Sequence, residues 1–126
     1  MELRSIFTES APKPAGHYSQ AIVHNGLIYI AGILPVHPKD GSIVKKDIKK
    51  SVIQVFDNLK AVLGEAGSDF SKMLKITVYI SNIDDWGEIN KIYAEIMGDS
   101  KPARTVIEVA RLHHDVILEI DGIAAV

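Results

Sequence analysis

The sequence contains no cysteine, which excludes disulfide scaffolds, thiol catalysis and cysteine-ligated zinc. Aromatic residues make up only 6% of the 126 residues, and no window approaches the roughly 18 apolar residues of a membrane-spanning helix. Neither sign of charge dominates, because 14 Lys and Arg stand against 16 Asp and Glu for a net charge of −2. The composition therefore offers no general attraction to nucleic acid or to anionic membranes.

The residues that are present are those of an ordinary folded domain, with 47% hydrophobic and 24% charged side chains. A chain of this length buries roughly two thirds of its unfolded surface, which is enough for a core without disulfides or structural metal. Residues 1–7 have an acid at the second position and no long apolar run, so they do not resemble a secretory signal. We expect one domain over residues 1–126, located in the cytoplasm.

Local patterns predict most of the secondary structure. Segments 21–24 and 27–30 are rich in β-formers, and Asn25-Gly26 between them favours a type I′ hairpin. Glycines and prolines over 31–46 predict a long loop. Asp47 is expected to cap a helix that ends near Gly64 or Gly67, and Asp84 or Asp85 to cap a second that stops at Gly98. Between the helices, residues 74–80 alternate in polarity like a strand with one buried face.

Two further strands are predicted over 103–110 and 116–124. If they pair antiparallel with their apolar faces together, four charged residues must share the opposite face: Arg104, Glu108, Glu119 and Asp121. The two helices would cover the apolar face. The predicted fold is an α+β domain with a mixed or antiparallel sheet and two helices on one face. Apolar residues beside the charges suggest that the second face is an oligomer interface.

Metal and phosphate motifs are missing from the sequence. The five histidines lack the HExxH pattern and the paired spacing of a zinc site, and no GxxxxGK[ST] or GxGxxG segment occurs. Arg104, which follows Pro102-Ala103, has two interpretations. It either forms a structural ion pair with Glu119 or Glu108, or anchors the carboxylate of a small acid through its planar guanidinium. Glu119 is correspondingly either an ion-pair partner or a general acid or base.

The chain resembles the RidA (YjgF) family nearly from end to end. Four segments carry the resemblance: 16–21 (GHYSQA), 31–35 (AGILP), 102–112 (PARTVIEVARL) and 118–124 (LEIDGIA). The resemblance implies a chorismate-mutase-like fold that assembles into a homotrimer, with a central barrel and a cleft at each subunit interface. It also implies hydrolysis of reactive 2-imino and 2-enamino acids, such as 2-aminoacrylate and 2-iminobutanoate, to 2-keto acids and ammonia.

The same resemblance assigns residues. Arg104 matches the arginine that binds the substrate carboxylate, and Glu119 the glutamate that positions the attacking water. Tyr18 matches the cleft tyrosine and Gly32 the glycine of the loop motif, while Val106 lines the site where active members often carry cysteine. No cofactor is required, because an imine carbon is already electrophilic and needs only an oriented water and proton transfer.

The sequence departs from the family pattern at three positions in the N-terminal third. His17 replaces a proline, and Ala31 and Ile33 replace a serine and a glutamine, which removes two polar side chains from the cleft wall. The replacements at Ala31 and Ile33 favour a rival function, a regulatory protein that binds a 2-keto acid without turnover. A second rival is the RNA-cleaving or translation-inhibiting role of some relatives, against which the charge of −2 argues. The expected partners are small 2-imino and 2-keto acids and further copies of the chain.

Overall fold

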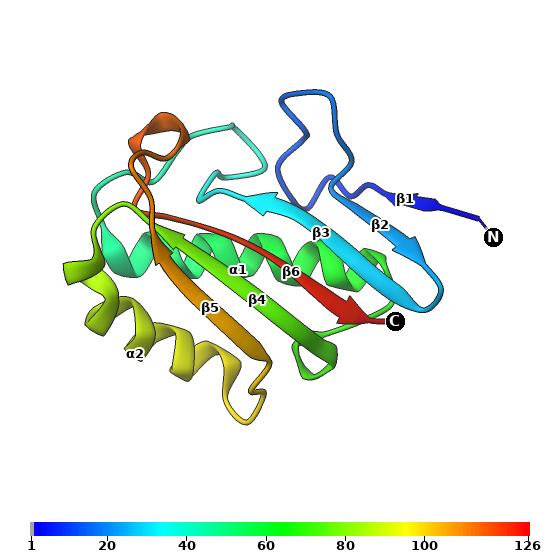
Figure 1. The fold of residues 1–126 in the computed structure, drawn as a ribbon. Helices are drawn as coiled ribbons and strands as arrows, with labels where there is room; N and C mark the ends of the chain where they lie inside the picture. The colour runs from blue at the N-terminus through cyan, green and yellow to red at the C-terminus, as the bar shows by residue number, and fades with distance from the viewer. Residues whose placement is uncertain (1) are drawn as a thin grey trace.

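The computed structural model describes residues 2–126 as a six-stranded mixed sheet with two α-helices on one face (Figure 1). The strands are β1 (Arg4–Ile6), β2 (Ala21–His24), β3 (Leu27–Ile33), β4 (Met73–Ile80), β5 (Ala103–Glu108) and β6 (Leu118–Ala125). The helices are α1 (Ile48–Glu65) and α2 (Trp86–Met97). The strand order is β1-β2-β3-β6-β4-β5, so β6 lies between β3 and β4. The predicted α+β class and the two helices on one face are confirmed.

The local signals in the sequence act as predicted. Asn25 and Gly26 have φ angles of 54° and 76°, and they join β2 to β3 as an antiparallel hairpin. The carboxylate of Asp47 accepts a hydrogen bond from the backbone N–H of Lys50 at 2.9 Å and so caps α1. Gly98, with a φ of 59°, ends α2 as expected. Strand β3 extends to Ile33, which shortens the predicted loop at its start.

The start of α2 and the first strand were not predicted correctly. Asp85 occupies the N-cap position of α2, but its side chain makes no capping hydrogen bond. Asn82 instead accepts a hydrogen bond from the backbone N–H of Asp84, in the short turn η2 (Ile83–Asp85) that leads into the helix. Strand β1 pairs antiparallel with β2 at the sheet edge, although three residues carry too little pattern to be recognised in the sequence.

The pairing predicted for the last two strands is wrong. β5 runs parallel to β4 at the sheet edge, whereas β6 pairs antiparallel with both β3 and β4. Helix α2 makes the crossover between β4 and β5, which is the usual connection for parallel neighbours. The apolar β6 takes the centre of the sheet, where both of its edges are paired.

This pairing also changes the face on which Arg104 lies. Arg104 is level with Ile76 of β4, which is fully buried under the helices, and paired residues share a face of the sheet. Arg104, Val106 and Glu108 are therefore on the helix side, contrary to prediction. Glu119 is level with Tyr79 and belongs to the open face, as does Asp121, in agreement with prediction.

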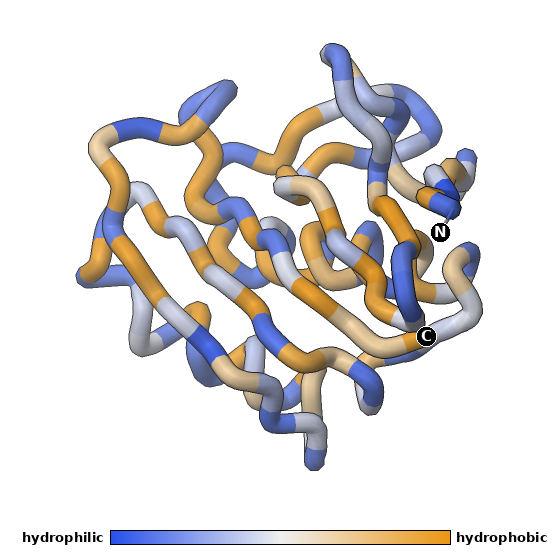
Figure 2. Tube along the Cα trace, turned by 45° about the vertical axis from the view of Figure 1, so that its right-hand side comes forward, coloured by the Kyte–Doolittle hydropathy of each residue, from blue (hydrophilic) through white to orange (hydrophobic). Residues whose placement is uncertain are grey.

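The core lies between the sheet and the helices, with Phe56 of α1 packed edge-on against Tyr93 of α2 at 5.5 Å between ring centres. Hydrophobic and hydrophilic residues are interspersed along the strands (Figure 2). No helix covers the face of the sheet opposite α1 and α2 (Figure 1). Tyr29 and Ile107, both exposed, belong to this open face. Within residues 2–126, no helix is long and apolar enough to cross a membrane.

Candidate functional site

Arg104 lies against α2 with its guanidinium between two aromatic rings. The guanidinium carbon is 4.8 Å from the ring centre of Trp86 and 4.9 Å from that of Tyr93. Nη1 donates a hydrogen bond of 2.9 Å to the side-chain oxygen of Asn90. Three α2 side chains thus hold the planar cation at the sheet edge, an arrangement that a lysine ammonium could not reproduce.

Neither ion pair considered for Arg104 is formed. Glu108 instead accepts a hydrogen bond of 2.9 Å from the backbone N–H of Ile83. Over residues 2–126 the structure contains a single ion pair, between Arg111 and Asp115 at 3.3 Å. The exposed guanidinium of Arg104 therefore retains N–H groups that no carboxylate of its own chain occupies.

Tyr93 adds a hydroxyl beside this cation. The hydroxyl is buried and has no hydrogen-bond partner in the described chain. Burial raises the pKa of Tyr93, and the nearby charge of Arg104 opposes that rise. The phenol therefore stays protonated at neutral pH.

Glu119 is half-buried on the open face, near one acidic group, Asp121, and one basic group, His113. Burial raises the pKa of Glu119, the negative charge of Asp121 raises it further, and His113 acts in the opposite direction. Asp121 accepts a hydrogen bond of 2.8 Å from the hydroxyl of Tyr79, whose own pKa is raised mainly by this bond. A carboxyl group with a raised pKa exchanges protons closer to neutral pH, which suits a general acid or base.

The backbone of Gly32 lies directly against the carboxylate of Glu119. A β-carbon at position 32 would overlap Oε2 of Glu119, so no other residue fits here without displacing the carboxylate. The β3–β6 pairing is irregular between Ile30 and Ile33, which brings the backbone of β3 close to the Glu119 side chain. The close approach of the backbone to Glu119 thus explains why a glycine is needed at position 32, the position matched by resemblance.

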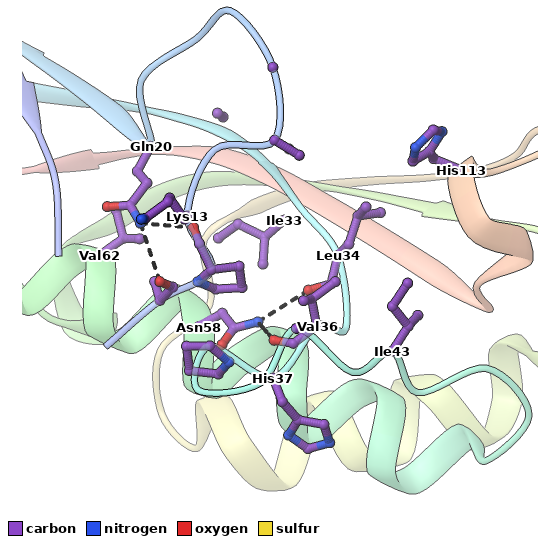
Figure 3. Close-up of a pocket in the computed structure, with 18 of the residues that line it drawn as sticks. Lys13, Gln20, Ile33, Leu34, Val36, His37, Ile43, Asn58, Val62 and His113 are labelled. Atoms are coloured by element: carbon purple, nitrogen blue, oxygen red, sulfur yellow. Dashed lines mark hydrogen bonds between the residues drawn. The ribbon is translucent and has the colours of Figure 1, made fainter. Parts of the chain in front are cut away.

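A cavity of about 610 Å³ opens at the same end of the sheet (Figure 3). Its wall comes from the loop before β2, the end of β3 with the loop that follows, α1, and the turn η3 (His113–Asp115). Tyr18 and Gly32 both line it, whereas Arg104, Val106 and Glu119 do not. Tyr18 is exposed at 54% of its surface, so it contributes a side chain that is accessible from solvent.

The five predicted site residues therefore fall into two groups in one chain. Arg104 and Val106 are on the helix side of β5, where Val106 packs against the core. Gly32 and Glu119 are in contact on the other side of the sheet, and Tyr18 shares the cavity wall with Gly32. The sheet therefore separates Arg104 from Glu119 within one chain.

Sequence reasoning missed four residues that surround these groups. Trp86, Asn90 and Tyr93 were assigned only to a helix, because their contact with Arg104 depends on the β4–α2–β5 crossover. His113 was considered only as one of five histidines without a zinc-site pattern. It is exposed, lines the cavity and acts electrostatically on Glu119. The described residues contain no group of three His, Asp or Glu that could hold a metal ion.

Comparison with known proteins matches residues 8–126 to the family model described as endoribonuclease L-PSP. The chain is 50% identical over 119 residues to a RutC family protein of Pyrococcus horikoshii, covering 94% of each chain. It is 34% identical to the chloroplastic Reactive Intermediate Deaminase A of Arabidopsis thaliana, over 94% of this chain and 64% of that one.

The chain belongs to the RidA family. A solved family structure, Escherichia coli TdcF with bound serine, superposes with a TM-score of 0.93 at 32% identity, covering 98% of each chain. The structure also locates the positions that depart from the usual RidA pattern. Ala31 and Ile33 line the cavity beside Gly32, and His17 is exposed in the loop before β2. The departures are therefore concentrated around the cavity, while Arg104 and Glu119 are retained.

Proposed function

We propose that the chain hydrolyses reactive 2-imino and 2-enamino acids, including 2-aminoacrylate and 2-iminobutanoate, to 2-keto acids and ammonia. The observation that carries this proposal is Arg104, an exposed guanidinium held by α2 with no carboxylate partner among residues 2–126. A planar guanidinium binds a carboxylate through two parallel hydrogen bonds. Membership of a family that includes a reactive intermediate deaminase supports the same activity.

The site requires two copies of the chain in this proposal. Arg104 and Glu119 lie on opposite faces of the sheet, so one small acid is not held by both within one chain. A neighbouring copy that packs against the open face would bring its Arg104 to the Glu119 end of the first copy. Exposed apolar side chains on that face, such as Tyr29 and Ile107, are suited to an interface. We propose a homotrimer in the cytoplasm with one such site at each interface.

The chemistry then follows from the two groups. Arg104 fixes the substrate carboxylate, and Glu119 accepts a proton from water as the water oxygen bonds to C2. The C=N π electrons move to nitrogen, which takes this proton from Glu119, and a tetrahedral carbinolamine forms. Glu119 then accepts the hydroxyl proton as the C2=O bond forms and passes it to the nitrogen, so that the C–N bond breaks, ammonia leaves and the carboxylate is regenerated. Water is consumed and one ammonia is released, with no oxidant or reductant.

The test generates 2-aminoacrylate with serine dehydratase in the presence of semicarbazide, which traps the imine before it hydrolyses. Active protein should lower the yield of trapped imine and raise the yield of pyruvate. Arg104→Lys keeps the charge but loses the planar fork, so binding of pyruvate should weaken by about 1 to 3 kcal/mol. Arg4→Lys, an exposed arginine of β1, is the matched control and should behave as the parent protein.

Two other outcomes would replace this proposal. Pyruvate binding that depends on Arg104, without any effect on trapping, would identify a regulatory protein that binds small carboxylates. Cleavage of single-stranded RNA that survives Arg104→Lys and Glu119→Gln would place a nuclease activity outside the site described here.

A further inference from the structure

The cavity next to Gly32 has walls made mainly of aliphatic side chains (Figure 3). Its volume of about 610 Å³ lies within the range of roughly 300 to 1,000 Å³ found for small-molecule sites. Most of the larger apolar side chains come from the end of β3, the following loop and α1. Among them are Ile33, Leu34, Val36, Ile43 and Val62.

The two amide side chains in the wall, Gln20 and Asn58, are engaged in hydrogen bonds within the protein. Gln20 accepts a hydrogen bond from the backbone N–H of Thr8 at 2.7 Å and donates to the carbonyls of Thr8 and Pro12 at 3.0 and 2.9 Å. Asn58 donates to the carbonyls of Leu34 and Val36 at 3.1 and 2.9 Å, and these bonds are drawn in Figure 3.

The oxygen of Asn58 accepts from Gln54 at 2.9 Å. Both amides therefore brace the loops that enclose the cavity, and they offer a ligand no free N–H donor. No Asp or Glu lines the cavity, and its basic side chains are Lys13 and three exposed histidines. An apolar group is the occupant that this interior accommodates without leaving a buried polar partner unsatisfied.

The cavity also adjoins the proposed reacting centre. Gly32 lines the cavity and at the same time touches the carboxylate of Glu119. The end of β3 at Gly32 is therefore shared by the cavity wall and by the contact with Glu119, although Glu119 itself does not line the cavity.

We propose that this cavity receives the substrate side chain, and that the chain prefers 2-imino acids with branched aliphatic or aromatic side chains to those with small ones. This inference rests on the proposed function and adds to it the substrate class. Each further methylene buried in an apolar site strengthens binding about fourfold, so an isobutyl side chain, with two more carbons than ethyl, gains about fifteenfold.

The test compares imines made in place by an L-amino acid oxidase, with catalase removing peroxide. L-leucine, L-phenylalanine and L-2-aminobutyrate supply isobutyl, benzyl and ethyl side chains, and the semicarbazide competition gives kcat/KM for each. We expect kcat/KM to be at least fivefold higher for the leucine- and phenylalanine-derived imines than for the one from 2-aminobutyrate. Equal values for all three would overturn the proposal.

Ile43→Trp fills the cavity and should reduce the ratio of leucine-derived to 2-aminobutyrate-derived kcat/KM at least fivefold. Ile53→Trp is the matched control, because Ile53 is 39% exposed on α1 and does not line the cavity. An unchanged ratio in a folded Ile43→Trp protein would contradict the proposal. Leu34→Ala provides a second variant should Ile43→Trp fail to fold, and enlarging the cavity should raise the ratio of phenylalanine-derived to leucine-derived kcat/KM.

Calorimetry separates this inference from the proposed function. 4-Methyl-2-oxopentanoate should bind more tightly than 2-oxobutanoate, and Ile43→Trp should remove the difference. If no imine is turned over but this preference is present, the proposed hydrolysis fails and the cavity assignment stands. If imines are turned over with no preference in kcat/KM or in binding, the hydrolysis stands and the cavity assignment fails.

Discussion

The side chains of Arg104 and Glu119 leave the sheet in opposite directions, Arg104 toward α2 and Glu119 toward the uncovered face. A site that uses both must combine two copies of the chain. In a homotrimer, Arg104→Ala and Glu119→Gln should each be nearly inactive alone. Coexpressed in equal amounts, they should regain about a quarter of the parent activity, because about one interface in four pairs an intact arginine with an intact glutamate.

The control is coexpression of each variant with itself, and light scattering should show the same trimer in every sample. A mixed sample no more active than the separate variants would place both residues in a single-chain site or outside the site altogether. A monomer at micromolar concentration would remove the interface on which the arrangement depends.

Glu119→Gln keeps the size of the side chain but cannot accept a proton from water. We expect kcat to fall by about 10² or more, with little change in the affinity for pyruvate. Steady-state kinetics and calorimetry measure the two quantities. A kcat near that of the parent would leave Glu119 without the proposed role.

The same substitution should change how stability depends on pH. Burial raises the pKa of Glu119 in the folded protein above its unfolded value, so the folded state binds more protons between those two values. The free energy of unfolding therefore decreases as pH rises through that window, and Glu119→Gln removes this loss. The variant should melt higher than the parent at pH 7 and lose that advantage near pH 4. A variant that is less stable than the parent at pH 7 would contradict the predicted direction of this pH dependence.

Gly32→Ala tests the contact between β3 and Glu119. The added β-carbon overlaps a carboxylate oxygen at the end of a flexible side chain, so the carboxylate can move aside while the strand stays in place. We expect activity to fall at least tenfold with little loss of stability, because a misplaced base loses its alignment with water. Gly64→Ala, where nothing lies near the added carbon, should keep activity and stabilise α1 by about 0.5 to 1 kcal/mol. Full activity in Gly32→Ala would mean that Glu119 need not occupy its present position.

His113 opposes the rise in the pKa of Glu119 when it is protonated. In His113→Asn this opposition is lost, so the pKa of Glu119 should rise further and the acid limb of the pH profile of kcat/KM should move to higher pH. His114 is the matched control, because it stacks against His113 at 3.9 Å between ring centres but is not among the groups that shift Glu119. His114→Asn should leave the limb in place, and an equal displacement in both variants would assign the effect to the turn rather than to His113.

Local signals in the sequence predicted those parts of the fold that depend on neighbouring residues. The Asn25-Gly26 turn, the Asp47 cap and the Gly98 stop each act over a few residues, and each is found in the structure. The partner of β5 could not be predicted in this way. Alternation identifies two faces of a strand but not which of them is covered, and Thr105 and Ile107 resemble a core face as much as Val106 does.

In the candidate site, too, some features could be predicted from the sequence and others depend on residues far apart in the chain. Resemblance selected Arg104, Glu119, Tyr18 and Gly32, and the structure supplies reasons for two of these residues: a cation stacked on α2 and a glycine pressed against a carboxylate. The separation of Arg104 from Glu119 depends on strand order, which involves residues far apart in the chain. The contact of Trp86 with Arg104 also depends on strand order. Neither this contact nor the separation of Arg104 from Glu119 can be predicted from a local sequence pattern.

Strand β6 joins two blocks of the sheet that share no other ladder, β1-β2-β3 on one side and β4-β5 on the other. Release of β6 would divide the sheet, so amide hydrogens of β6 and of the strands it bonds should exchange with solvent only in the rarest openings. Strand β5 has a single neighbour and should open more often. Glu119 and Gly32 should thus be carried by the slowest-exchanging part of the molecule, whereas Arg104 should be carried by a strand that opens more readily and that packs against α2.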